Sequence, residues 1–269
     1  MRKSNYWQER IQSSLDKYLS RTQKENEAAL AAIYKQAIQE VRDEIVKVFS
    51  KIADSKQKGE EVLPNDYYRN KRYWELLDSI NEKLVALGEK QIEITQPAII
   101  ETYNETMRII GKEYVPDDEG LFSPTPLIDS GEAATQILKQ AWCADGKTFS
   151  DRVWEDKSRM LEELKRQLSR CIVQGKSPWD AAKQVSDRLS VSRSNAYRLM
   201  RTECAHAQIY AQTKRYKELG FTQGEWDADS CSCPHCKEQD GKRYPLDRIR
   251  DMIPAHPNCK CYFSLVVDK

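Results

Sequence analysis

The sequence has little glycine, little histidine and no long apolar run. Only 10 of its 269 residues are glycine and 3 are histidine, whereas 39% are hydrophobic and 32% are charged. No stretch approaches the roughly 18 consecutive apolar residues that a membrane-spanning helix needs, so we expect no membrane partner. A composition this charged and this poor in glycine is typical of long, partly exposed helices rather than of one compact ball.

The charge balance and the first residues exclude two further classes of protein. The chain has 43 basic and 42 acidic residues and a formal net charge of +1, so any contact with nucleic acid has to come from a local patch. The opening MRKSNYW is largely polar and runs into a charged stretch, and we therefore expect no secretory leader. We expect the chain to be made in the cytoplasm.

Residues 1–115 predict an N-terminal helical domain. Residues 5–56 contain no proline or glycine, and their apolar residues recur at three- and four-residue steps, which predicts one long helix with the stripe Leu30, Ile33, Ala37, Val41, Ile45 and Val48. We expect a second helix to begin near Asp66 and to bury Trp74, Leu77, Ile80, Leu84 and Leu87. Pro97 is expected to start or kink a third helix.

Residues 116–131 predict a linker between two domains. They include Pro116, Gly120, Pro124, Pro126 and Gly131. Proline removes a backbone donor and fixes φ, so regular structure is not expected there. The segment is interpreted either as a domain boundary or as an extended arm that docks on a partner.

Residues 132–269 predict a second domain, with helices within 149–219 and a small module over 220–269. Ser177 is expected to cap a short helix that ends near Leu189, and Ser192 to cap the next, with Gly220 just past its end. Residues 262–267 predict a strand, with 221–227 as its partner. The fold class is therefore mainly α, with a small α+β module at the C-terminal end.

The cysteines and histidines gather in that module. Five of the eight cysteines and two of the three histidines lie between residues 231 and 261. Two Cys/His pairs separated by about 15–20 residues are the spacing of a closed zinc site. We expect the ligands to be Cys233, Cys236, His256 and one of Cys259 and Cys261, with Cys231 and His235 spare. Unligated thiols and a disulfide are the alternatives.

Polar residues near this motif have two interpretations each. Arg201 and Glu203 point in different directions on a helix, so they cannot form one catalytic cluster. One of them contacts the zinc module, or both lie on a solvated face. Asp229 either accepts a hydrogen bond from His256 and fixes its tautomer, or caps a turn.

A basic stretch between residues 188 and 217 also has two interpretations. It is a solvated helix face, or it tracks the phosphates of DNA. The candidate DNA contacts are Arg193, Arg198, Lys214 and Arg215.

Over residues 192–267 these motifs resemble the phage head morphogenesis family, the Mu F-like and SPP1-like minor head proteins. The residues that carry the resemblance are Arg201-Thr202-Glu203, Gly220, Trp226, Asp229, Cys233-Pro-His-Cys236, Gly241 and His256-Pro-Asn-Cys-Lys-Cys261. Lys260 stands where the family pattern has arginine, and Cys231 is an additional cysteine.

The resemblance implies a minor capsid protein of a tailed bacteriophage, without enzymatic activity. Such a protein is expected in the virion, in the head interior or near the portal, and in the host cytoplasm during assembly. It is expected to bind the portal protein and to assist head assembly and DNA packaging or delivery. The major capsid or scaffolding protein and DNA are further candidate partners.

Two rival functions follow from the same residues. A zinc-dependent hydrolase needs an open coordination position, but at least four good ligands are present here, and the sequence contains no His-Glu-x-x-His, nucleophile elbow or P-loop. A zinc-stabilised nucleic-acid-binding protein is the other alternative, supported by the basic stretch and opposed by the near-zero net charge.

Overall fold

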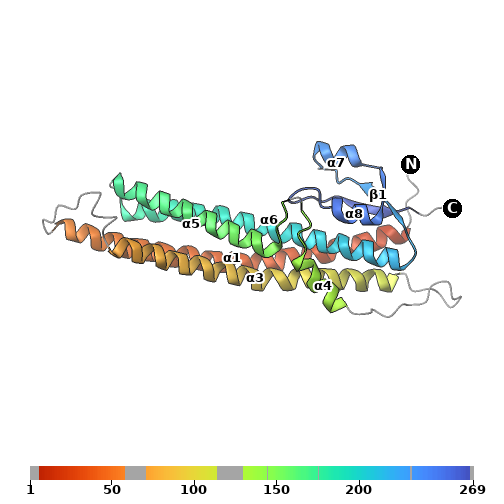
Figure 1. Cartoon of the computed structure of the whole chain (residues 1–269), viewed down its shortest axis with the longest axis horizontal. Helices are drawn as coiled ribbons and strands as arrows, with labels where there is room; N and C mark the ends of the chain where they lie inside the picture. Colours follow the sequence, from red (N-terminus) through yellow and green to blue (C-terminus); the bar gives the residue numbers. More distant parts are fainter. Residues whose placement is uncertain are drawn as a thin grey trace. The chain divides into compact units, whose positions relative to one another are not determined.

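The computed structural model describes residues 6–57, 71–113, 130–143, 145–174, 176–230 and 232–266 (Figure 1). The chain is mainly α-helical, with a three-stranded antiparallel sheet near its C-terminal end, which confirms the fold class. Among the described helices, none combines the length and the apolar composition needed to cross a bilayer.

The chain forms two compact units, each assembled from separate stretches of sequence. The sheet unit comprises Met1–Asn26, Thr95–Phe149 and Arg198–Lys269, and the helical unit comprises Glu27–Ile94 and Ser150–Tyr197. The predicted linker over 116–131 lies almost wholly outside the described residues. The division of the sequence into residues 1–115 and 132–269 therefore stays a prediction.

Parts of α1 (Tyr6–Gln57), α3 (Lys71–Glu113), α5 (Phe149–Val173) and α6 (Pro178–Glu218) make up the helical unit. Their apolar stripes meet in one core that includes Val41, Ile45, Leu77, Ile80, Leu84, Leu87, Leu164 and Leu168. The long first helix is confirmed. The prediction that Trp74 is buried was wrong: this residue is 53% exposed, because the helical period turns its neighbour Tyr73 inward instead.

Two predicted helix boundaries were also wrong. Pro97 does not start a helix: it lies inside α3, which continues from Lys71 to Glu113, and Ala98 and Ile99 beside it are buried. This packing offsets the lost backbone hydrogen bond. A kink at Pro97, the other expectation, stays a prediction. Ser192 does not begin a helix, since α6 runs unbroken through it and its hydroxyl bonds to other helices instead of capping.

Ser192 belongs to a buried polar network within the helical unit. The ammonium of Lys157, only 4% exposed, donates to the Tyr34 hydroxyl and contacts Asp156 at 3.2 Å and Ser192 at 3.3 Å. The Tyr34 hydroxyl lies 3.0 Å from Gln91 Oε1. Burial lowers the pKa of Lys157 and raises that of Tyr34, because each charged form loses hydration.

The sheet unit contains three short strands in the order β2-β1-β3. Strand β1 (Gln223–Asp227) pairs antiparallel with β2 (Arg243–Pro245) and with β3 (Tyr262–Leu265). The predicted C-terminal strand and its partner are confirmed. The helices α4 (Ser130–Lys139), α7 (Pro234–Gln239) and α8 (Leu246–Met252) and strand β2 were not predicted.

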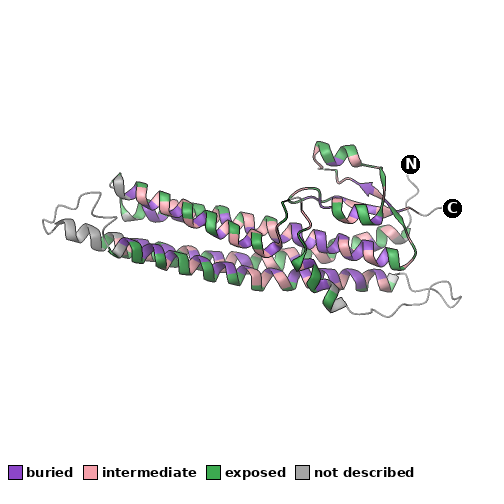
Figure 2. Cartoon of the chain, viewed as in Figure 1, coloured by how far each residue is buried: buried purple, intermediate pink, exposed green. Residues whose placement is uncertain are grey.

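The sheet packs on the ends of long helices through one core (Figure 2). Trp226 is fully buried there, together with Ile11, Leu15, Ile110, Ile249 and Phe263. The chain enters the sheet through Gly220, whose φ of +87° ends α6. Its N–H bonds to Lys217 O at 3.0 Å and that of Phe221 to Tyr216 O at 3.0 Å, which is a Schellman motif.

Candidate metal centre

The first pair of donors lies at the start of α7. Cys233 is the N-cap of this helix, Pro234 occupies its first turn, and the N–H of Lys237 donates to Cys233 O at 3.0 Å. Cys236 follows three residues later and is fully buried. Residues three apart at a helix start lie on the same side, so both thiols face one point.

The second group of donors lies on a tight turn before β3. The N–H of Cys259 donates to His256 O at 3.1 Å, which closes a four-residue turn. Pro257 fixes φ at the second position, and Asn258 at the third has φ of +61°. This is a type II turn, and asparagine tolerates its positive φ better than most residues. The turn carries His256 and Cys259 at its two ends, with Cys261 two residues further on.

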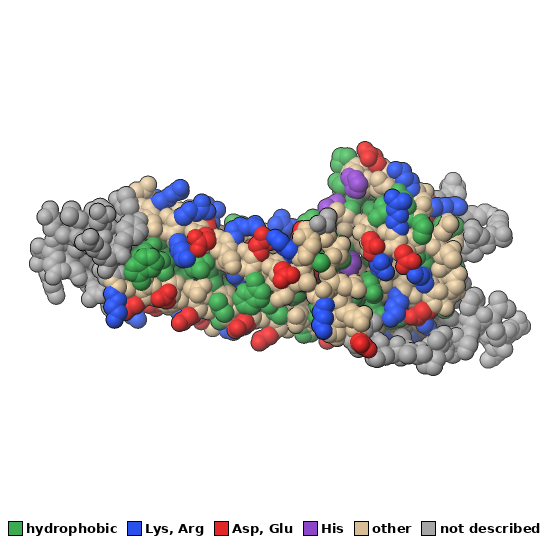
Figure 3. Space-filling view, viewed as in Figure 1, with side chains coloured by type: hydrophobic (Ala, Val, Ile, Leu, Met, Phe, Trp, Pro, Cys, Tyr) green, Lys and Arg blue, Asp and Glu red, His purple; other side chains and the backbone are tan. Residues whose placement is uncertain are grey.

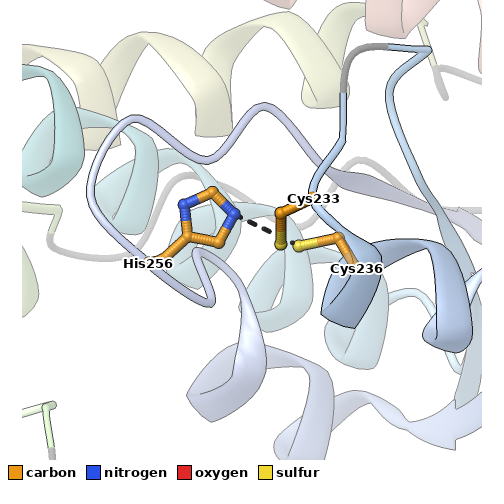
Figure 4. Close-up of side chains that lie close together, drawn as sticks. All are labelled: Cys233, Cys236 and His256. Carbon is orange, nitrogen blue, oxygen red and sulfur yellow. Dashed lines mark hydrogen bonds between the residues drawn. The ribbon is translucent and has the colours of Figure 1, made fainter.

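The two groups converge on Cys236. Its Sγ lies 3.3 Å from His256 Nε2 (Figure 4). It also lies 4.0 Å from Cys259 Sγ. The donors form two sets of three, and within each set all donor atoms lie within 4.8 Å of one another. Both sets include Cys236: the first is Cys233, Cys236 and His256, and the second is Cys236, Cys259 and Cys261. The structure thus places the five predicted donors in two overlapping sets of three, joined through Cys236. His235 is exposed, and Cys231 lies outside the described residues.

Two of these separations are close to those expected between ligands of a tetrahedral zinc site. Bonds of about 2.3 Å to sulfur and about 2.05 Å to nitrogen, at tetrahedral angles, put two sulfurs about 3.8 Å apart and a sulfur and a nitrogen about 3.5 Å apart. The observed 4.0 Å and 3.3 Å are close to both values. A disulfide would need about 2.05 Å between sulfurs, and the seven described cysteines are free.

The thiols differ in how readily they ionise. A hydrogen bond from the backbone N–H of Cys236 lowers the pKa of Cys233. Burial raises the pKa of Cys236 and of Cys259, because a buried thiolate loses hydration. A divalent cation would reverse this preference, since a coordinated thiol is deprotonated. The donor set therefore suits a soft cation such as zinc, and its thiolate-rich, buried character suits a closed structural site.

Thr202 ties this loop to helix α6, a role that the sequence patterns did not predict. Its hydroxyl donates to Arg198 O at 2.7 Å and accepts from the N–H of Asn258 at 3.2 Å. The bond fixes the turn that presents His256 and Cys259. The sequence feature that could have pointed to Thr202 is its position in the Arg-Thr-Glu motif. Glu203 beside it is buried and accepts from Trp142 Nε1 at 2.9 Å, and Arg201 is half-buried.

Asp229 lies in the turn after β1, where its carbonyl oxygen accepts from the N–H of Ser232 at 2.9 Å. Nδ1 of His256 lies 3.0 Å from the carbonyl oxygen of Pro257, which can hold the ring with Nε2 directed at the cluster. The assignment of this role to Asp229 stays a prediction.

The basic stretch of α6 carries several ion pairs. Arg215 is buried and donates to Glu218 at 2.9 Å, and Lys217 bonds to Asp247 at 2.7 Å. Arg198 is exposed, while Arg193 and Lys214 are half-buried. Basic and acidic side chains are interspersed over the face shown in Figure 3. DNA contact through Arg193, Arg198, Lys214 and Arg215 stays a prediction.

Residues 162–264 match the family model described as Phage Mu protein F like protein. This confirms the resemblance over that part of the chain, which contains α6, strands β1 and β2, all of β3 except Leu265, and all five donors. No curated protein and no solved structure matches the chain.

Proposed function

We propose, from the Mu protein F-like character of residues 162–264, that this protein is a minor structural component of a tailed phage head. In this proposal it binds the portal protein and assists head assembly and DNA packaging or delivery, and it acts without catalysis. The major capsid or scaffolding protein and DNA are its further proposed partners, and the virion is its location.

The observation that carries the proposal is that the segment that matches the family model contains the Cys/His cluster. Every donor between Cys233 and Cys261 lies inside residues 162–264, and so does Thr202, which fixes the donor loop. The family pattern and the geometry thus identify the same small module.

A zinc ion in this module would have a structural role. Cys233, Cys236, His256 and one of Cys259 and Cys261 would hold it. The strands of the module are three to five residues long, so they bury little apolar surface by themselves. Bound zinc would add on the order of 10 kcal/mol to the folding of the module. A closed set of four protein ligands leaves no position for a catalytic water, which favours a structural protein over a hydrolase.

Co-purification with the portal protein of the same phage tests the proposal. The zinc-loaded chain is expected to migrate with the portal protein on a sizing column. The Cys236→Ser variant is expected to lose this complex if the module forms the contact surface, and Cys171→Ser serves as the matched control, since Cys171 is buried outside the cluster. Failure of the zinc-loaded protein to form any complex, together with metal-dependent hydrolysis of DNA or peptide, would overturn the proposal.

A further inference from the structure

A groove of about 1090 Å³ lies in the sheet unit between the first turns of α1 and strand β3. Its volume is at the upper end of the range for ligand-binding pockets, which is large enough for a short peptide. Among the described residues that line it, none belongs to the Cys/His cluster. The groove is therefore a second feature of the unit, separate from the candidate metal centre.

Strand β3 presents backbone hydrogen-bonding groups to this groove. It is an edge strand of the described sheet, with β1 on one side. The N–H of Val266 donates to Gln223 O at 3.1 Å, so Val266 faces β1. Because strand residues alternate, the N–H and C=O groups of Phe263 and Leu265 point the other way, into the groove. An edge of this kind is a template for another strand.

One side chain already uses this edge. Gln8 Nε2 donates to the carbonyl oxygen of Leu265 at 3.2 Å. The bond confirms the outward direction of that carbonyl. It also places a side-chain amide where the N–H of an added strand would bind.

The opposite wall is polar throughout. Nine residues of α1 between Gln8 and Lys24 line the groove, and all nine are polar or charged. An extended peptide carries hydrogen-bonding groups along both edges, and buried ones need partners. Strand β3 can satisfy one edge, and side chains such as Gln12, Ser13 and Ser20 can satisfy the other. A wholly polar wall does not suit an apolar small molecule.

Charge along the wall is uneven. Lys17, Arg21 and Lys24 follow one another at helical spacing towards the end of the α1 wall far from Gln8, whereas Glu9 and Asp16 lie nearer Gln8. Across the groove, the lining includes Glu225, Asp227 and Arg243. The contact of Arg21 with Glu25 is 3.8 Å long and both side chains are 69% exposed, so it is a weak ion pair that a ligand can replace. This end of the groove favours carboxylates.

We propose that the groove binds an extended, acidic peptide segment of a partner protein, which adds to β3 as a fourth strand. A second copy of the chain is a poorer occupant, because the β3 edge of each copy is flanked by its own α1 and two such edges cannot meet. The inference goes beyond the proposed function, since it concerns a separate surface and does not require the partner to be the portal protein.

A yeast-displayed library of random dodecapeptides, selected against the full chain, tests this inference. We expect enriched peptides to combine β-branched and acidic residues and to lack proline. With a selected peptide bound, the amide protons of Phe263 and Leu265 should exchange at least about tenfold more slowly, as backbone pairing requires. The exchange of the Ser264 amide, which faces β1, should stay unchanged.

Two variants and a control locate the binding. Ser13→Trp fills the groove and Arg21→Glu reverses its charge, and each should weaken peptide binding about tenfold, or about 1.4 kcal/mol. Arg10→Glu is the matched control, because Arg10 is exposed on α1 but does not line the groove. Circular dichroism confirms that each variant is folded.

Three results would overturn the inference: no enrichment, binding that neither groove variant weakens, or concentration-dependent protection of Phe263 and Leu265 without peptide, which would indicate self-association. A failed portal complex would leave these results unaffected, so the two proposals can fail separately.

Discussion

Replacement of Thr202 by valine tests how the donor loop is held. Valine keeps the shape of the side chain, which is 9% exposed, and removes the hydroxyl. Two hydrogen bonds are lost: the one donated to Arg198 O and the one accepted from the N–H of Asn258. The first is local to α6, whereas the second joins residues 56 positions apart. The second bond should carry the effect.

The expected magnitude follows from the surroundings of that N–H. A buried donor left without an acceptor costs about 1–3 kcal/mol. Asn258 is an exposed residue, so water can partly replace the hydroxyl and the lower end applies. We expect about 1 kcal/mol of local destabilisation, which is about fivefold in the opening equilibrium of the turn.

A matched control isolates this bond. Thr106 is fully buried and donates to Thr102 O at 2.7 Å, the same helical bond that Thr202 makes to Arg198. Within the part of the chain that the structure describes, no loop N–H donates to Thr106, so Thr106→Val removes the helical bond alone.

Amide hydrogen exchange by NMR measures the outcome. In Thr202→Val, the amides of Asn258 and Cys259 should exchange about fivefold faster than in the wild type, and in Thr106→Val they should not change. Equal exchange in the two variants would refute the idea that Thr202 fixes the turn.

Two further substitutions test packing and burial. Gly224→Ala would place a methyl group 2.7 Å from Ile249 Cδ1 and should lower the unfolding free energy by about 1–3 kcal/mol in urea denaturation. Gly111→Ala, where the nearest atom to the added methyl group is 3.7 Å away, should be neutral or stabilising. Equal effects of the two substitutions would contradict the close packing around Gly224. The folded-state pKa of Lys157 is below its ordinary 10.5, so the unfolded chain binds more protons between the two values, and wild-type stability should rise with pH in that window relative to Lys157→Met. Urea denaturation over a pH series checks this, and a difference in unfolding free energy between wild type and Lys157→Met that falls with pH would refute it. The raised pKa of Tyr34 affects stability only above its ordinary value of 10.0, where the unfolding free energy should fall as pH rises.

Patterns that repeat along the chain predicted most of the fold. The stripe through Val41 and Ile45 and the β-branched run after Cys261 each depend on local periodicity, and both were confirmed. Strand β2 could not be found this way, because it is three residues long and ends in a proline. It forms only because β1 pairs with it.

Long-range contacts also explain the errors within the helices. Ser192 looked like a cap because serine favours that position, yet its hydroxyl bonds to Tyr34 and Asp156, which are 158 and 36 positions away. Nothing near Ser192 in the sequence indicates these partners. Pro97 was misjudged for the same reason, since the burial of its neighbours depends on other helices.

The sequence predicted the candidate metal ligands but not the residue that holds their loop in place. Ligand spacing is a local property, so Cys233, Cys236 and His256 could be proposed as ligands from sequence, and the structure places their donor atoms within 4.8 Å of one another. Thr202 could not be assigned, because its bond to Asn258 exists only in the folded chain. The choice between Cys259 and Cys261 stays open, because both lie within reach of Cys236.

Metal content is the measurement that tests the central claim most directly. Protein purified under reducing conditions and analysed by inductively coupled plasma mass spectrometry should contain about one zinc per chain. Cys236→Ser, which removes the donor shared by both sets, should contain almost none, and Cys171→Ser should match the wild type. Wild-type protein without stoichiometric metal, or Cys236→Ser with as much zinc as the wild type, would contradict the claim.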